Sequence, residues 1–193
     1  FAKINKNAKL LLHSDPYDIA APFSLQELIF RYKLENRVLF TGTDFFHPFN
    51  YKDMNEVYNI MDVFFLSTSG EGFGVPTIEA MACGIPQLVT DYTTSKELVQ
   101  DDGQSGMVAL LSGESDFCPY PHTDEILDGT LTGSWDVERG VMSIYDATKK
   151  LDLMSNDKKM MSEFRVNGLK KVEQFYDWKV IMPQWKKFIK ELK

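Results

Sequence analysis

The sequence has few cysteines, no excess of positive charge and no long apolar run, and each shortage excludes a class of protein. Only two of its 193 residues are cysteine, Cys83 and Cys118, which is too few for a disulfide framework. Its net charge of -7 argues against non-specific nucleic-acid binding, which needs a basic face. No apolar run reaches the roughly 18 residues of a transmembrane segment, and no signal-peptide pattern is present. We therefore expect a soluble cytoplasmic protein, with peripheral membrane association left open.

Clusters of metal-ligating residues are also lacking. Neither DPYD, residues 15–18, nor Asp101-Asp102 has histidine or carboxylate partners at metal-binding spacing, and both are typical of turns. The remaining composition is ordinary, because 44% hydrophobic and 25% charged residues are close to globular averages. We expect one large domain, or one domain with extensions. The first residues, 1–3, read like the end of a helix, so we expect the natural polypeptide to begin earlier.

Short apolar runs alternate with stretches of helical periodicity as far as Leu111. Strands are predicted at residues 8–13, 37–42, 62–67, 86–90 and 106–111. Helices are predicted between them at residues 25–34, 53–60, 75–83 and 95–99. Such alternation is typical of an α/β fold with a doubly wound parallel sheet. Ligands of these sheets bind beyond the carboxyl ends of the strands.

The alternating pattern stops between Ser112 and Asp136, where the sequence is acidic and rich in turn formers. We expect a surface excursion without chemistry there. Three helices are predicted after it, at residues 137–153, 157–175 and 177–193. The last helix has an apolar stripe that consists of Trp178, Ile181, Trp185, Phe188 and Ile189, behind a good N-cap in Asp177. Core packing is the first explanation of this stripe, and docking on another domain is the second.

The stretch GEGFGVPTIEAMACGIP, residues 70–86, joins a predicted strand to a predicted helix. Gly72 and Gly74 allow a positive φ or a close backbone approach. The free N–H groups and the dipole at the start of the helix favour an anion such as a diphosphate. Glu79 could accept hydrogen bonds from the vicinal hydroxyls of a ribose, and Glu71 could face a sugar beyond the diphosphate. Spacing alone leaves the simpler explanations open, namely a first-turn acid favoured by the dipole and a solvated loop residue.

The segment from Glu71 to Pro86 resembles the signature of the retaining family-4 glycosyltransferases (glycosyl transferases group 1), in which seven residues separate two glutamates. The order and spacing of RVLFTG, EVYNIMDVFFLSTSGEGFG and PQLVTDYTTSKELVQDDGQSGMV are similar to the family's over residues 9–108. Asp177-Trp178 also resembles the start of the family's terminal helix. The resemblance implies one half of a GT-B enzyme, which has two Rossmann-like domains around a cleft. Residues 1–176 would form the C-terminal, donor-binding domain, and helix 177–193 would dock on the absent N-terminal domain.

The resemblance also implies roles for individual residues. Glu71 corresponds to the glutamate that the family uses in catalysis beside the donor sugar, and Glu79 to the glutamate that holds the donor ribose. Backbone contacts to the sugar and diphosphate are expected from Gly72, Phe73, Gly74 and Val75. Contacts to the base are expected around Thr43 and Asp44.

The reaction that the resemblance implies is retaining transfer of a sugar from a nucleotide-diphosphate sugar to a hydroxyl of a sugar, lipid or other acceptor, as in carbohydrate biosynthesis. It implies neither a metal nor another cofactor. Two departures stand out: no Arg or Lys near Glu71 replaces the family's diphosphate ligands, and YTTS, residues 92–95, replaces a glycine-rich segment. Two alternatives remain: a nucleotide-sugar-binding or docking domain that does not catalyse when isolated, and a glycosidase with paired carboxylates.

Overall fold

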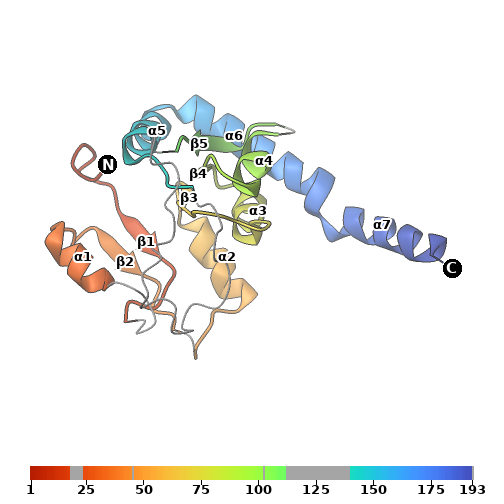
Figure 1. Ribbon diagram of the computed structural model, residues 1–193, viewed down its shortest axis with the longest axis horizontal. Coiled ribbons are helices and arrows are strands. Elements are labelled where there is room, and N and C mark those ends of the chain that lie inside the picture. Colours follow the sequence, from red (N-terminus) through yellow and green to blue (C-terminus); the bar gives the residue numbers. More distant parts are fainter. Residues whose placement is uncertain (18–23, 45, 102, 112–139, 193) are drawn as a thin grey trace, which may run out of the picture. The chain divides into compact units, whose positions relative to one another are not determined.

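A computed structural model describes residues 1–17, 24–44, 46–101, 103–111 and 140–192 of the chain. The chain divides into two compact units, residues 1–60 and 61–193. Figure 1 labels the helices and strands of both units.

The first unit contains a pair of parallel strands and two helices. Its elements are β1 (Leu10–Leu12), α1 (Leu25–Arg31), β2 (Val38–Phe40) and α2 (Tyr51–Asn59). β1 pairs with β2 so that Leu11 lies opposite Leu39. α2 begins at a capping box. The Asn50 side chain accepts hydrogen bonds from the N–H groups of Lys52 and Asp53, and the Asp53 side chain accepts one from the N–H of Asn50. A polar residue at the helix boundary therefore sets where this helix starts.

The second unit is a three-stranded parallel sheet with helices on both faces. Its elements are β3 (Phe64–Leu66), α3 (Val75–Ala82), β4 (Gln87–Thr90), α4 (Thr94–Gln100), β5 (Gly106–Ala109), α5 (Ile144–Asn156), α6 (Lys158–Lys171), the π-helical turn η3 (Val172–Tyr176) and α7 (Trp178–Glu191). β4 lies between β3 and β5 and is parallel to both. All four of its residues are buried, which makes β4 the centre of the unit.

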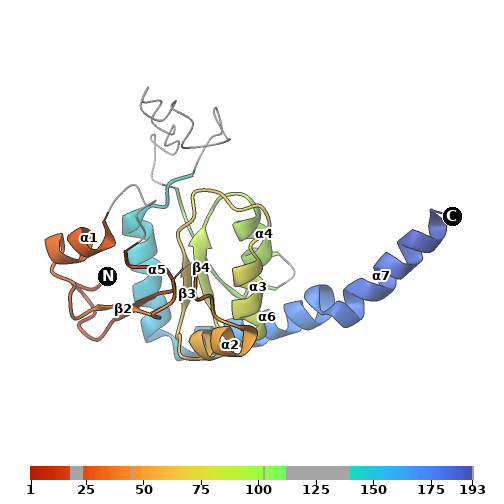
Figure 2. The same cartoon turned by 90° about the horizontal axis from the view of Figure 1, so that it is seen from below.

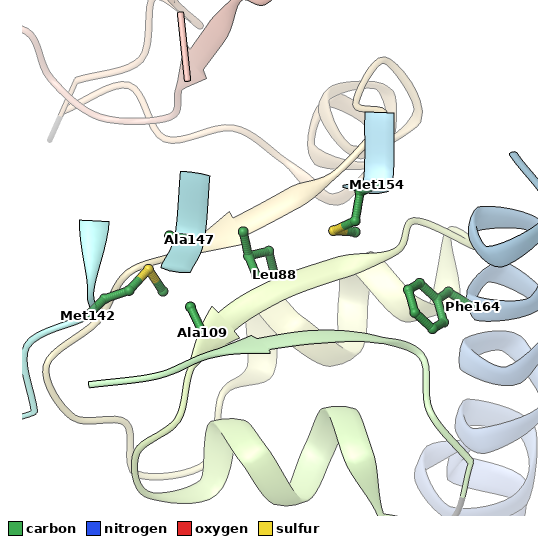
Figure 3. Close-up of a cluster of buried hydrophobic side chains, with 6 residues drawn as sticks. All are labelled: Leu88, Ala109, Met142, Ala147, Met154 and Phe164. Carbon is green, nitrogen blue, oxygen red and sulfur yellow. The ribbon is translucent and has the colours of Figure 1, made fainter. Parts of the chain in front are cut away.

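Alternate side chains of β4 pack into two different layers of helices. On one face of the sheet, Leu88 and Ala109 of β5 pack in a hydrophobic cluster with side chains from α5 and α6 (Figure 3). The other members of that cluster are Met142, Ala147, Met154 and Phe164. On the opposite face, Val89 and Val108 pack against Val99 of α4. Figure 2 shows α5 on one side of the strands and α3 and α4 on the other. The unit is thus an α/β/α sandwich of the Rossmann-like kind.

The predicted α/β fold with parallel strands is confirmed, and every strand and helix predicted up to residue 111 is present in the predicted order. The helix predicted at residues 137–153 begins only at Ile144, so its predicted start was wrong. Met142 instead pairs with Leu111 in an antiparallel bridge, and the Ser143 hydroxyl then caps the helix by accepting from the N–H of Asp146 (3.3 Å). The segment predicted to be a surface excursion, residues 112–136, lies outside the described residues.

The C-terminal helices also differ from the prediction. The helix predicted at 157–175 changes at Val172 from α6 to the π-helical turn η3. Asp177 caps α7 as predicted, by accepting from the N–H of Lys179 (2.8 Å). The prediction that the apolar stripe packs in the core is wrong. α7 has no buried residue, and Trp178 and Trp185 are 70% and 55% exposed. Among the described helices, none combines the length and the apolar character needed to cross a membrane.

Asp146 ties the first turn of α5 to the end of β5. Its Oδ2 accepts from the N–H of Leu110 (2.8 Å) and pairs with Nζ of Lys150, and both side chains of this ion pair are only 19% exposed. Burial raises the pKa of Asp146, but the hydrogen bonds from Lys150 and Leu110 lower it more, so the pKa lies below its usual value of 3.8. The charged carboxylate is therefore the form that stabilises this junction.

We expect Asp146→Asn to lower the free energy of unfolding at pH 7 by about 1–3 kcal/mol, since a charge-assisted hydrogen bond is lost at a mostly buried site. Urea unfolding measures the change. Glu163→Gln is the matched control, because Glu163 pairs with Lys159 at the same helical spacing but at 4.0 Å and in solvent. We expect that control to change stability by less than about 1 kcal/mol. Equal losses in the two variants would contradict this role of Asp146.

The same comparison has a defined pH dependence. A carboxyl group whose pKa is lowered by folding contributes its full stabilisation above its unfolded-state pKa and loses it as the pH falls through the folded-state pKa. The difference between the wild type and Asp146→Asn should therefore be constant near neutral pH and shrink only below about pH 4.

Candidate functional site

The loop between β3 and α3 carries most of the predicted site residues. It begins at Thr68, whose Oγ1 donates to the carbonyl of Gly70 (2.8 Å). It ends at Gly74, which has φ +85° and ψ +46°, a left-handed conformation that suits glycine. α3 then begins at Val75 with Pro76 in its first turn, as predicted. The glycine therefore turns the chain directly from the sheet edge into the helix.

The start of α3 presents a row of backbone amides. Among the described residues, no hydrogen-bond acceptor is found for the N–H groups of residues 72–75, whereas Thr77 and Ile78 donate to the carbonyl of Gly74 at 3.0 and 3.3 Å. Unpaired N–H groups at this end carry the positive end of the helix dipole. The buried Thr77 hydroxyl, in the same turn, also lacks a hydrogen-bond partner within the described part of the chain. This arrangement suits the binding of anionic oxygen atoms.

The backbone of Glu71 is bonded to the loop that follows β4. Its N–H donates to Oγ1 of Thr93 (3.0 Å), and its carbonyl accepts from Oγ1 of Thr94 (3.1 Å). β3 and β4 are parallel neighbours, so their carboxyl ends meet at one edge of the sheet. The sequence interpretation missed both threonines. The available signal was that YTTS, residues 92–95, occupies the place of a glycine-rich segment.

Glu79 lies on α3 itself, after the row of amides, and is half-buried. It is one helical turn before Cys83, and the pKa of that thiol is raised first by burial and then by the negative charge of Glu79. Glu71 thus precedes the helix start and Glu79 follows it, within one unit.

Phe73 projects from the glycine turn and is 54% exposed. Its ring meets the ring of Tyr176 edge to face, with centroids 6.2 Å apart and planes at 77°. Tyr176 is the last residue of η3, so the turn contacts the segment from which α7 departs.

The two predicted base contacts, Thr43 and Asp44, belong to the first unit, and both form hydrogen bonds within it. The buried Thr43 donates from Oγ1 to the carbonyl of His47 (3.0 Å). Asp44 accepts from the N–H groups of Phe46 and His47 (both 2.8 Å) and lies 2.9 Å from the His47 ring. The hydrogen bond to the His47 side chain is the main reason that the pKa of Asp44 is lowered. Both side chains therefore hold the shape of their own loop.

His13 lies at the end of β1, close to the same loop. Its Nδ1 is 2.9 Å from Oγ1 of Thr41, and its ring is 5.3 Å from that of Phe49. Asp15 stabilises the following turn by accepting from the N–H of Tyr17 (2.8 Å). Within the described ranges, no three His, Cys, Asp or Glu side chains are grouped as metal ligands would be.

Comparison with known proteins gives the relatives of this chain. Residues 4–109 match the family model described as glycosyl transferases group 1. N-acetyl-alpha-D-glucosaminyl L-malate synthase of Bacillus anthracis is 29% identical over 159 residues, which are 80% of this chain and 38% of that protein. The chain thus spans well under half of the length of this curated relative.

Solved structures of two proteins show the same fold. Anabaena Alr3699/HepE in complex with UDP has a TM-score of 0.67 and 20% identity, over 95% of this chain and 41% of that one. The C-terminal domain of the glycosyl transferase group 1 family protein LpcC from Francisella tularensis has a TM-score of 0.59 and 19% identity, over 91% of this chain and 73% of that one.

We expect Gly74→Ala to lower the free energy of unfolding by about 1–3 kcal/mol, because alanine is strained at a positive φ. The added Cβ would also lie 2.9 Å from Cδ1 of Leu98. Gly72→Ala is the control, since a Cβ there meets nothing within 4 Å. Urea unfolding should show a clearly smaller loss for Gly72→Ala, and a similar loss in both variants would refute a special role for the Gly74 conformation.

Proposed function

Because this chain belongs to the glycosyl transferases group 1 family, we propose that it binds a nucleotide-diphosphate sugar and transfers the sugar to an acceptor hydroxyl with retention of configuration. The observation that carries the proposal is the row of unpaired amides at residues 72–75, with Glu71 before it and Glu79 after it. The relatives support this donor, since Anabaena Alr3699/HepE is described in complex with UDP and with UDP-glucose.

The amides of residues 72–75 receive the diphosphate in this proposal. Negative charge grows on the diphosphate as the bond to the sugar breaks. Fixed N–H donors at a helix start stabilise that charge more in the transition state than in the ground state.

The two glutamates divide the remaining work. Glu79 accepts hydrogen bonds from the ribose hydroxyls of the donor. Glu71 lies beside the sugar, where its charge orients the donor and assists departure of the leaving group. The acceptor oxygen bonds to the anomeric carbon on the face from which the diphosphate departs, and a departing phosphate oxygen takes the acceptor's proton. Retention follows because bond formation and bond breakage share one face.

We expect Glu71 and Glu79 to separate catalysis from binding in the full-length polypeptide that carries this domain. Glu71→Gln should lower kcat by about 100-fold or more while the donor Kd changes by less than about threefold, because its charge acts mainly in the transition state. Glu79→Ala should raise the donor Kd by about tenfold or more, because two hydrogen bonds to a carboxylate are lost. Release of nucleotide diphosphate measures turnover, and calorimetric titration with a donor panel measures Kd.

Glu163→Gln, a charge change on an exposed part of α6, is the control for both glutamates. Unchanged turnover in Glu71→Gln would remove Glu71 from the mechanism, and an unchanged Kd in Glu79→Ala would remove Glu79 from the donor site. Failure of the wild type to release nucleotide diphosphate from any donor, with any acceptor tried, would overturn the proposed transfer itself.

We further propose that the apolar face of α7 docks on the part of the enzyme outside this chain, so that residues 1–193 alone do not catalyse transfer. Trp185, Phe188 and Ile189 are 55%, 53% and 52% exposed, which is costly for a face of large apolar side chains. A second domain is the occupant that fits, since this chain spans 41% of Anabaena Alr3699/HepE.

We expect Trp185→Ser to lower the stability of the full-length polypeptide by about 1–3 kcal/mol through lost apolar burial. Lys187→Ser, on the opposite side of α7, is the control and should have little effect. Thermal or urea unfolding measures both, and the same substitutions in residues 1–193 alone should be neutral. A loss that is equally large in the shorter polypeptide would show that Trp185 packs within this domain instead.

A further inference from the structure

Thr93, at the start of α4, has a backbone conformation that β-branched residues avoid. Its φ is 50° and its ψ is -145°. Side-chain atoms at Cβ crowd the backbone in this region, which glycine occupies readily. Among the described residues other than glycine, only Lys33 also has a positive φ. Thr93 is therefore strained, and something must favour threonine over glycine at this position.

The Thr93 hydroxyl supplies a reason. It accepts the N–H of Glu71 at 3.0 Å, and the next residue, Thr94, donates its own hydroxyl to the carbonyl of Glu71 at 3.1 Å. Two consecutive side chains thus bind both polar backbone atoms of a single residue on the neighbouring loop. Glycine would fit the φ of residue 93 but has no hydroxyl to offer. The strained backbone of Thr93 therefore accompanies the hydrogen bond from the N–H of Glu71, which requires a hydroxyl side chain at residue 93.

This double hydrogen bond holds the backbone from which the Glu71 side chain projects. Cγ of Glu71 lies 3.4 Å from the point where a Cβ on Gly74 would stand, so the side chain starts out against the beginning of α3. The side chain keeps its own rotatable bonds, but the point from which it starts is held by hydrogen bonds at both polar atoms of its backbone. The β4–α4 loop therefore sets the point from which Glu71 extends beside the amides of residues 72–75.

We propose that Thr93 and Thr94 are positioning residues for Glu71, with the strained backbone of Thr93 retained for its hydroxyl. The proposal rests on the role of Glu71 in the proposed function. It assigns a purpose to residues that stand where a glycine-rich segment is usual, and it needs no contact between either threonine and the donor.

Three substitutions of Thr93 test the proposal in the full-length polypeptide. Thr93→Val keeps the shape and the strain but loses the acceptor, and we expect kcat to fall by about tenfold with a donor KM within about threefold of the wild type. Thr93→Ser keeps the hydroxyl and should retain most of kcat. Thr93→Gly removes both strain and hydroxyl, so it should unfold at a higher urea concentration than Thr93→Val and yet be as slow. If Thr93 only stabilised the fold, the more stable glycine variant would also be the faster one. Higher stability together with an equally low kcat therefore points to a positioning role.

Amide hydrogen exchange at Glu71 reports the contact without any substrate. Exchange should be faster in Thr93→Val and Thr93→Gly than in the wild type, and near the wild-type rate in Thr93→Ser. Equal kcat values for the valine and serine variants would overturn the proposal, as would a glycine variant with wild-type kcat. If the wild type releases no nucleotide diphosphate, the proposed function fails, and the Glu71 exchange rates alone then support or overturn the hydrogen-bonded arrangement.

Discussion

The burial of β4 on both faces is the constraint on which the rest of the second unit depends. Leu88 and Val89 are adjacent in sequence but enter different helical layers, and neither is exposed to solvent. A shift of one residue in the pairing of β4 would exchange these two layers, so the register against β3 and β5 is strongly specified. Fixed register in turn fixes where β3 and β4 end. The Glu71 loop and the Thr93 loop therefore meet because the core packing of β4 fixes the ends of the strands that precede them.

Much of this fold could be predicted from the sequence because its signals are local. The apolar run DVFFLS predicted β3, and the glycines with Pro76 predicted where α3 begins. The start of α5 could not be found in this way, because the pairing of Met142 with Leu111 joins residues distant in sequence. The stripe on α7 was visible in the periodicity, but periodicity does not reveal what covers a helix face.

In the candidate site, too, local sequence signals identified some residues, whereas residues that act through distant contacts were missed. Glu71, the glycine turn and Glu79 lie within one short stretch, so residue types and spacing were enough to select them. Thr93 and Thr94 escaped notice because their contacts are from side chains to the backbone of another loop. Such contacts leave no periodic pattern. Their one signal in the sequence is that YTTS, residues 92–95, stands where the resemblance leads one to expect glycines.

The bridge between Leu111 and Met142 has a mechanical consequence. It ties the segment that enters α5 to the chain just after β5, and Gly140 adds a hydrogen bond from its N–H to the carbonyl of Ser69 (3.2 Å), just after β3. The loop that contains Ser69 and Glu71 is therefore braced from two directions, by Gly140 and by the threonine pair after β4. A displacement of this loop would stretch hydrogen bonds to both neighbours at once, so the three segments respond to force as one piece.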